Sequence, residues 1–249
     1  MSGHSKWATI KHQKGAKDQK RGKLFAKLIR QVEVAARQGG GDINANAALR
    51  TMFAKARAAS VPIDTIERAV KRGTGELEGV TYESITYEGY APCGVAVLVE
   101  VLTDNRNRTG PEIRSMLSKL GGSLAEPGAV AWQFSRLGQV YVPGTVAEDD
   151  VMMAALDAGA TDVVLDGSSW KITCEPNAVE TVHEALTAAG IPVDSAEATM
   201  VSSTIVELTN ADDARKVLKV IDGLEDNDDV QDVYANFDIS EEILASLEA

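Results

Sequence analysis

Hydrophobic side chains recur at helical spacing in the first third of the chain. The positions i, i+3, i+4 and i+7 of one stretch are all apolar and predict a helix over 18–38: Phe25, Leu28, Ile29 and Val32. The same spacing predicts a second helix over 44–59 and a third over 62–72, with Pro62 in its first turn and Gly73 as its end signal. These elements are typical of a small helical module.

The period of the hydrophobic pattern changes to two after residue 80. VTYESITYEG (80–89) alternates like a strand, and VAVLVEVLT (95–103) predicts a second, more buried strand. The residues Thr-Gly-Pro-Glu fit a capping box that opens a helix over 109–120. AVAWQF (129–134) predicts another strand.

The next segment contains a complete β-α-β-β-α-β order. Its expected elements are a strand at 139–143, a helix at 147–159, strands at 162–166 and 170–175, a helix at 177–189 and a strand at 193–200. This order is that of the split βαβ, or ferredoxin-like, arrangement.

If that unit closes on itself, the flanking segments must pair with each other. The strand 203–209, the helix 211–222 and the strand 232–239 would then complete the sheet begun at residue 81. The sequence therefore predicts an α+β fold with a small helical N-terminal domain and two ferredoxin-like α/β sandwich domains, one inserted in the other. The expected domains are 1–79, a discontinuous domain of 80–135 and 202–249, and the inserted 136–201; a continuous two-domain division is the alternative.

Composition supports a globular, cytoplasmic protein. Of the 249 residues 44% are hydrophobic but only 5% aromatic, so the expected core is aliphatic. Cys93 and Cys174 lie far apart, which argues against a disulfide framework and a zinc site. The longest apolar run, CGVAVLVEVL, is ten residues and contains a glutamate, which is too short to span a bilayer. The start is polar from residue 2, without a signal-peptide pattern.

The distribution of charge is the most informative property. Residues 1–75 hold 16 Lys+Arg and 5 Asp+Glu, a net charge of +11, whereas the remainder holds 9 and 32, a net charge of -23 within a chain total of -12. Solvation of a surface does not require such segregation of sign. The asymmetry favours a basic module that binds a polyanion, with an acidic body that the polyanion repels.

The first 23 residues form the strongest candidate for that binding. Seven of them are Lys or Arg, against one acid, and lysine recurs at every third position from residue 11: Lys11, Lys14, Lys17, Lys20 and Lys23. A cationic segment with no apolar face to bury is expected to be mobile when free and to bind phosphates by counterion release. Arg21 adds a further cation. Trp7 could stack on an unpaired base or fold back onto the helical module, and both readings stay open.

Motifs for catalysis are missing. GTGELEG (73–79) follows a predicted helix and is not GxGxxG, and Gly22-Lys23 lacks the rest of a phosphate-binding loop. The three histidines have no metal-ligand spacing, and the acidic stretch 224–232 misses the EF-hand pattern, so a solvated loop is favoured over a cation site. We expect no enzymatic activity, no cofactor and no metal.

Residues 48–72 also fit a helix-turn-helix pattern, but the start of the would-be reading helix is acidic, with Asp64 and Glu67. An ordinary helical hairpin is favoured there.

The stretch TDNRNRT (103–109) is a second candidate for binding. It follows a buried strand and would place two arginines beside the N-terminus of a helix, where they could hold phosphate or an acidic protein surface. The alternative is an asparagine-rich turn whose arginines pair with the acidic body. The residues concerned are Asn105, Arg106, Asn107 and Arg108.

Four motifs in one order together resemble the YebC/PmpR family almost from end to end. They are MSGHSKWATIKHQKGAKDQKRGKLFAKLIR, YEGYAPCGVAVLVE, TDNRNRT and LAEPGAVAWQF, of which GHSKW is the sharpest. The sequence departs from the family pattern at GYAPCG, where Ala91 and Cys93 stand in place of glycine; a positive φ at Cys93 would strain that turn.

The resemblance implies a three-domain α+β protein without enzymatic activity, found in the cytoplasm. Family members are described as DNA-binding transcriptional regulators and as ribosome-associated factors that help translation through consecutive prolines. It also implies a basic opening, which maps onto His4, Lys6, Trp7, Lys11, His12, Lys14 and Lys17.

We therefore predict a nucleic-acid-binding regulator of gene expression. Its target is DNA, by the commoner description of the family, or, as the alternative, ribosomal RNA or tRNA, with the ribosome as a partner; a third hypothesis is a protein–protein adaptor. No membrane partner is expected, and the absence of a dimerisation signal favours a monomer over an obligate oligomer.

Overall fold

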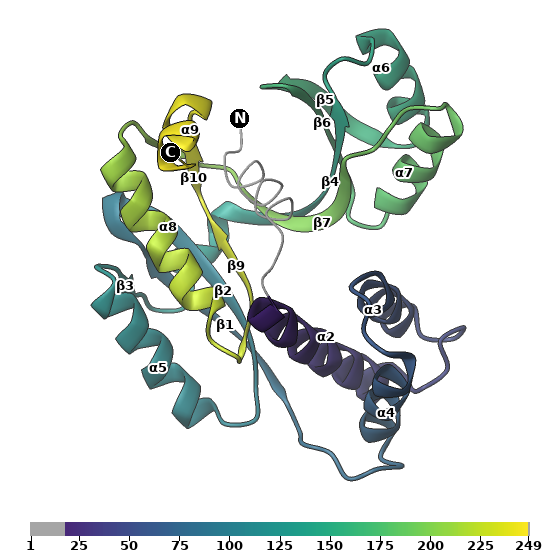
Figure 1. Cartoon of the computed structure of the whole chain (residues 1–249), viewed down its shortest axis with the longest axis vertical. Coiled ribbons are helices and arrows are strands. Elements are labelled where there is room, and N and C mark those ends of the chain that lie inside the picture. The colour runs from purple at the N-terminus through teal and green to yellow at the C-terminus, as the bar shows by residue number, and fades with distance from the viewer. Residues whose placement is uncertain (1–17, 249) are drawn as a thin grey trace.

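The computed structural model describes residues 18–248 and confirms an α+β fold, with helical and antiparallel-sheet layers (Figure 1). Three groups of elements are visible: the helices α2, α3 and α4; a sheet covered by α5 and α8; and a second sheet covered by α6 and α7. The domain bounds expected from the sequence stay a prediction, but the pairing of the strands described below is compatible with an insertion.

The helical module consists of α2 (Asp18–Gly39), α3 (Ala47–Ala58) and α4 (Ile63–Thr74). Its core is small and aliphatic, and is built around Leu28, Val32, Leu49, Ala56, Val61, Ile66 and Ala69. Asn46 caps α3 by accepting a hydrogen bond from the Leu49 backbone N–H at 3.0 Å. The predicted helical hairpin is thus formed by α3 and α4, both of which pack against α2.

Gly73 was expected to end the third helix, but α4 continues to Thr74 and the left-handed residue behind it is Gly75, with φ +84°. The reason lies in the packing of the helices. A Cβ atom on Gly73 would lie 2.4 Å from the carbonyl oxygen of Glu33 and 2.7 Å from the Cβ of Ala36, so this glycine permits a close approach of α4 to α2.

The first sheet has the strand order β3-β1-β2-β9 and is antiparallel. Its strands are β1 (Glu83–Tyr90), β2 (Ala96–Thr103), β3 (Ser123–Leu124) and β9 (Val230–Ala235). Helices α5 (Arg106–Lys119) and α8 (Ala211–Glu225) cover one face, where the valines of β2 meet Ile113, Leu117 and the apolar side of α8. The other face packs against Val130 and Phe134.

The second sheet has the order β5-β6-β4-β7 and carries helices α6 (Glu148–Asp157) and α7 (Val179–Ala188). Its strands are β4 (Phe134–Pro143), β5 (Ala160–Asp166), β6 (Ser169–Cys174) and β7 (Ser195–Ser202). The first and third strands of this unit are central and antiparallel, as the ferredoxin-like order requires. All four strands lie between β3 and β9 in the chain, so the second sheet is inserted in the sequence between two strands of the first.

Three expected strands differ from the structure. The one expected at 232–239 is divided into β9, in the first sheet, and β10 (Phe237–Ile239), in a separate sheet. Residues 129–133 form a turn and the short helix η2 (Ala131–Gln133), and β4 begins only at Phe134. The strand expected at 203–209 is shortened to β8 (Val206–Leu208), which pairs in parallel with β10 (Phe237–Ile239) in a separate two-stranded sheet. Helix α9 (Glu241–Glu248) follows and packs against α8 through Leu244.

The turn before β2 contains a non-glycine residue in a left-handed backbone conformation. Cys93 lies in the short helix η1 (Pro92–Gly94) with φ +64° and ψ 15°, the left-handed region that favours glycine. A non-glycine residue in this region costs roughly 1–2 kcal/mol. Cys93, where the sequence departs from the family pattern, thus adopts a strained backbone conformation.

Candidate nucleic-acid interface

Most of the predicted binding arm lies outside the described residues: His4, Lys6, Trp7, Lys11, His12, Lys14 and Lys17. Lys20 and Arg21 lie at the start of α2. The structure therefore describes the helix that contains the end of the predicted arm, and the surfaces around that helix.

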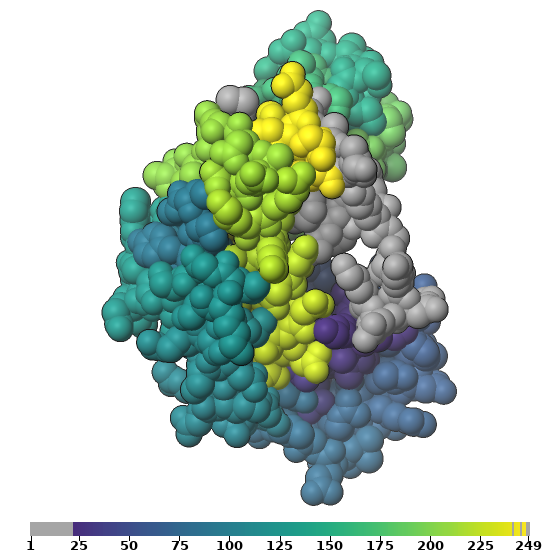
Figure 2. Space-filling model, turned by 60° about the vertical axis from the view of Figure 1, so that its left-hand side comes forward, coloured from purple at the N-terminus to yellow at the C-terminus, as the bar shows by residue number. Residues whose placement is uncertain are grey.

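Helix α2 is held against the first sheet by three basic side chains that follow one another at helical spacing. Each donates to a backbone carbonyl at or just beyond the C-terminal end of α8: Lys23 to Asp226 at 2.8 Å, Lys27 to Glu225 at 2.7 Å and Arg30 to Asp228 at 2.6 Å. A helix C-terminus offers unpaired carbonyls and the negative end of its dipole, so it is a natural site for cations. Figure 2 shows this yellow-green segment beside the purple part of α2.

Lys23, a predicted nucleic-acid ligand, is thus engaged in an intramolecular contact at the surface; its ammonium also lies 3.4 Å from the Asp226 carboxylate. The acidic stretch 224–232, for which a solvated loop was favoured, instead receives the basic face of α2. Two of its carboxylates, those of Asp226 and Asp229, pair with Lys23 and Arg30 of α2. No group of His, Cys, Asp or Glu within residues 18–248 is arranged to hold a metal ion.

Asp229 is the centre of this contact. Its side chain is buried and accepts hydrogen bonds from four groups: Arg30 Nη1 at 3.0 Å, Arg108 Nη2 at 2.7 Å, Thr109 Oγ1 at 2.7 Å and Thr103 Oγ1 at 3.1 Å. Burial opposes ionisation of Asp229, but the hydrogen bonds from Arg108, Thr109 and Thr103 outweigh it and lower its pKa. One carboxylate therefore joins α2, β2 and α5.

The second predicted site is not a loop. Helix α5 was expected from residue 109 but begins at Arg106, because Asn105 caps it by accepting from the Arg108 backbone N–H at 3.1 Å. Arg108 lies between Asp104, 2.9 Å away, and Asp229, which is the alternative in which the arginine pairs with the acidic body. Arg106 and Asn107 are exposed on the first turn, and Arg106 forms no ion pair with another described side chain.

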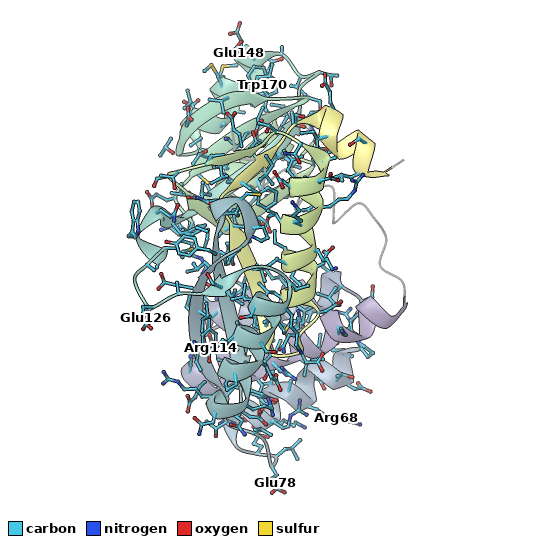
Figure 3. All side chains as sticks on the ribbon, turned by 90° about the vertical axis from the view of Figure 1, so that its left-hand side faces the viewer. Arg68, Glu78, Arg114, Glu126, Glu148 and Trp170 are labelled. Carbon is cyan, nitrogen blue, oxygen red and sulfur yellow. The ribbon has the colours of Figure 1, made fainter. Side chains whose placement is uncertain are left out.

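Exposed cations lie on the solvent-facing sides of α3 and α4. They are Lys55, Arg57, Arg68 and Lys71, besides Arg50, which donates to the carbonyls of Ile43 and Asn44. None of the five pairs with an acidic side chain in the part of the chain that the structure describes. Arg68 points outward at the lower end of the molecule in Figure 3. The neighbouring Arg72 is different, since its Nε lies 2.9 Å from the buried carboxylate of Glu33 and it serves to join α4 to α2.

The exposed first turn of α4 carries Asp64 and Glu67. A helix that reads bases in a major groove presents its N-terminal residues to them, and two carboxylates there would be repelled by the phosphates. The surface is therefore suited to contact a phosphate backbone with lysine and arginine, and α4 is poorly suited to read sequence. No helix within residues 18–248 is long and apolar enough to cross a membrane.

Sequence reasoning missed two buried carboxylates, Asp229 and Glu88, because both act on groups that are distant in the chain. Glu88 on β1 accepts hydrogen bonds from the backbone N–H groups of Gly128, Val130 and Ala131 at 2.6, 2.7 and 2.7 Å. Burial raises its pKa, but these three donors together lower it below the ordinary value. The alternating pattern of β1, which places Glu88 on one face of the sheet, was the only sequence signal for its contact with these backbone N–H groups.

Comparison with known proteins agrees along nearly the whole chain. A family model described as "TACO1/YebC protein N-terminal domain" matches residues 5–76, and one described as "TACO1/YebC second and third domain" matches residues 82–237. The chain is 55% identical to a probable transcriptional regulatory protein of Corynebacterium aurimucosum over 249 residues, covering 99% of each chain. It is 56% identical to a protein of the same description from Rubrobacter xylanophilus, again with 99% of each chain covered.

Among solved structures, the chain is similar to a conserved hypothetical protein from Aquifex aeolicus. The two share 44% sequence identity and superpose with a TM-score of 0.76, over 90% of this chain and 93% of the other. The arrangement of helices and sheets described above is therefore one that a crystal structure of a related sequence also contains.

Proposed function

The chain belongs to the TACO1/YebC family, and from this premise we propose that it is a non-enzymatic, nucleic-acid-binding regulator of gene expression that acts in the cytoplasm. The relatives are named as probable transcriptional regulatory proteins, which makes transcription the first context to test. The family's second description, a ribosome-associated translation factor, is the second candidate.

One observation carries the proposal: the basic charge of the chain is concentrated in its first 75 residues, and part of it is exposed on α3 and α4 without an acidic partner among the described side chains. The acidic end of α8 and Asp229 face inward and hold α2, whereas Lys55, Arg57, Arg68 and Lys71 face outward. The predicted arm precedes most of α2 in the chain and adds the cations Lys6, Lys11, Lys14, Lys17, Lys20 and Arg21. About six phosphate contacts would give a log–log salt slope near -5 on duplex DNA.

A specific observation favours RNA as the second candidate. The acidic first turn of α4 argues against base reading in a duplex groove, so recognition would rest on phosphates and on single aromatic side chains. Folded RNA offers irregular phosphates and unstacked bases together. In this reading Trp7 and the lysines enter a cleft of ribosomal RNA and the acidic body stays outside it. Arg106, exposed on the first turn of α5, is the remaining candidate for a phosphate or partner contact.

The test compares two variants of equal charge. One replaces Lys11, Lys14, Lys17 and Lys20 by Glu; the control replaces four exposed cations of α5 and α8 by Glu, namely Arg114, Lys119, Arg215 and Lys219. Binding to duplex DNA, protein-free ribosomal RNA and ribosomes is measured over a range of salt concentrations. We expect the arm variant to lose binding at least tenfold more than the control, with an unchanged melting temperature.

Equal losses in both variants would mean that net charge rather than the arm governs binding, and the arm would be rejected as the binding element. Sedimentation of a lysate through a sucrose gradient separates the two candidates. Comigration with ribosomes that high salt abolishes supports the translation factor. A protein that stays at the top of the gradient in low salt rejects that candidate and leaves DNA as the target.

A further inference from the structure

The second sheet has helices on one face only. Helices α6 and α7 lie on its outer side and pack against Val140, Trp170 and Ile172 (Figure 1). Because successive side chains of a strand point to opposite faces, the neighbours of these residues point away from both helices. This second face, which we name the open face, includes Gln139 and Tyr141 of β4, Asp162 and Asp166 of β5, Lys171 of β6 and Glu197 of β7.

The open face is polar, yet much of it is buried. Its residues Gln139, Tyr141, Asp166 and Lys171 each have 9% or less of their surface exposed. The face of an antiparallel sheet that carries no helix is ordinarily solvated. Among the described helices, the two whose apolar side chains join this core are α6 and α7, and both lie on the opposite face. The open face therefore has the burial of a contact surface.

The ionic groups of the open face are mainly acidic. Lys171 Nζ lies 3.9 Å from Asp166 Oδ2 and compensates one carboxylate. Asp162 and Glu197 are exposed, and neither forms an ion pair with another side chain of residues 18–248. Burial raises the pKa of Tyr141, and the negative charges of Asp166 and Glu197 act in the same direction.

The acidic surface continues onto the first sheet, because β7 lies against β9. Burial raises the pKa of Tyr234 on β9, and the charges of Asp232, Glu100 and Glu197 raise it further, against the opposite effect of Arg136. Glu100 and Asp232 stand directly opposite each other on β2 and β9. Like charges in this position destabilise a sheet unless cations compensate them.

The described cations do not balance these carboxylates. Glu88, on the same face of the first sheet, is already bound by three backbone N–H groups. The remaining charged groups have a net charge of -3, from the five carboxylates of Asp162, Asp166, Glu197, Glu100 and Asp232 and the two cations Lys171 and Arg136. We name the open face together with Glu100 and Asp232 the acidic surface. It is complementary to a short cationic segment.

The chain itself contains such a segment. Residues 1–17 hold four lysines and no acidic residue. The segment ends where α2 begins, and this start of α2 lies close to β9, because Lys23 and Lys27 bind Asp226 and Glu225 just before that strand. Its extended length of up to about 60 Å far exceeds the width of a four-stranded sheet, which is about 15 Å.

We propose that residues 1–17 dock on the acidic surface of their own chain, and that a nucleic acid must displace them to bind. The docking rests on the charge and topology of the two sheets, whereas the competition also rests on the proposed function. The lysines that would contact phosphate are then held by carboxylates until a polyanion of higher charge density replaces them. Since Asp162, Glu197 and Asp232 are exposed, each contact is weak and the segment is readily released.

The test compares two variants of the full chain with equal charge. One replaces three exposed residues of the acidic surface: Asp162→Asn, Glu197→Gln and Asp232→Asn. The control replaces three exposed residues of α6 and α7, which cover the opposite face: Asp157→Asn, Glu180→Gln and Glu184→Gln. The measurement is the rate at which trypsin cleaves after Lys6, Lys11, Lys14 and Lys17 in the absence of nucleic acid.

We expect cleavage to be about fivefold faster in the acidic-surface variant, the factor that the loss of a few exposed ion pairs produces, and unchanged in the control. The affinity for duplex DNA and for protein-free ribosomal RNA should exceed that of the control by about the same factor, because the apparent affinity scales with the fraction of chains whose segment is free. Both variants should keep the melting temperature of the natural chain. If the triple variant fails to fold, Glu197→Gln is compared with Glu184→Gln.

Equal cleavage rates in the natural chain and both variants would overturn the proposal, and so would equal acceleration in both variants, which would make net charge the cause. Protection that increases with protein concentration would assign the acidic surface to the segment of a second copy and overturn docking within one chain. Faster cleavage in the acidic-surface variant without any gain in affinity for nucleic acid would support the docking and reject the competition. Failure of the proposed function itself is recognised separately, when the lysine-to-glutamate arm variant keeps its affinity for nucleic acid.

Discussion

Replacement of Asp229 by Asn should loosen the helical module from the first sheet. The change keeps the volume of the side chain but removes the charge on which Arg30 and Arg108 converge. Thr103 and Thr109 can reorient their hydroxyls, whereas the two arginines cannot accept a hydrogen bond from the new amide.

The expected cost follows from the two arginine contacts. Hydrogen bonds to charged groups contribute about 1.5–3 kcal/mol each, and we take the lower value because the arginine side chains are 22% and 44% exposed and remain partly hydrated. The free energy of unfolding should therefore fall by about 3 kcal/mol. For a chain of this size the melting temperature would fall by about 6–12 °C.

The assay is thermal unfolding followed by circular dichroism, with hydrogen exchange of α2 as a local readout. The control is Asp228→Asn, in which the neighbouring exposed carboxylate is changed but the carbonyl that binds Arg30 is kept. We expect the control to remain within about 0.5 kcal/mol of the natural chain. A loss for Asp229→Asn no larger than that of the control would refute the assignment of Asp229 as the joint.

The pH dependence gives an independent check of the same residue. Because the folded-state pKa of Asp229 is lowered, its ionised form contributes stability above the unfolded-state pKa of roughly 4, and this contribution is lost as the pH falls through the folded-state value. The stability difference between the natural chain and Asp229→Asn should be constant near neutral pH and shrink below about pH 4. A difference that grows in acid would contradict the argument.

Two further predictions concern the sheets. Glu88→Gln replaces one acceptor oxygen by an amide donor that faces backbone N–H groups, so it should cost about 2–3 kcal/mol and speed hydrogen exchange at Gly128, Val130 and Ala131; unchanged exchange there would contradict the role of Glu88. Gly138→Ala places a Cβ atom 2.5 Å from Cys174 Sγ within the second sheet and should lower the free energy of unfolding by about 1–3 kcal/mol. An unaltered melting curve would show that the neighbouring atoms move to make room for the methyl group.

The regular elements were largely predictable because their signals are local. The alternation in 80–89, the helical spacing in 18–38 and the β-α-β-β-α-β order of 139–200 all correspond to elements that the structure contains. The strand expected at 129–134 was wrong because the segment is shaped by Glu88, which lies about forty residues away and overrides its apolar composition.

The candidate site was predictable in its charge but not in its contacts. The count of charged residues identifies the basic module, but no local sequence pattern reveals that Arg108 and Arg30 bind the same carboxylate, 121 and 199 residues further along the chain. For the same reason the capping box at 109–112 misplaced the start of α5. Asn105 caps the helix and fixes its start three residues earlier, and it lies between Thr103 and Arg108, which both bind Asp229.

These contacts change the meaning of the charge asymmetry. Of the basic side chains that give the first 75 residues their net charge of +11, Lys23, Lys27 and Arg30 are satisfied by the end of α8, and Arg72 by Glu33. The acidic body would thus repel a polyanion, and it also binds α2 and fixes the orientation of that helix. Because α2 is anchored through its own cations, the positive charge left for a ligand belongs to the arm and to the outer surface of α3 and α4. A polyanion that approached the rest of α2 would have to compete with carbonyls and with a buried carboxylate, so binding at the arm need not weaken the joint at Asp229.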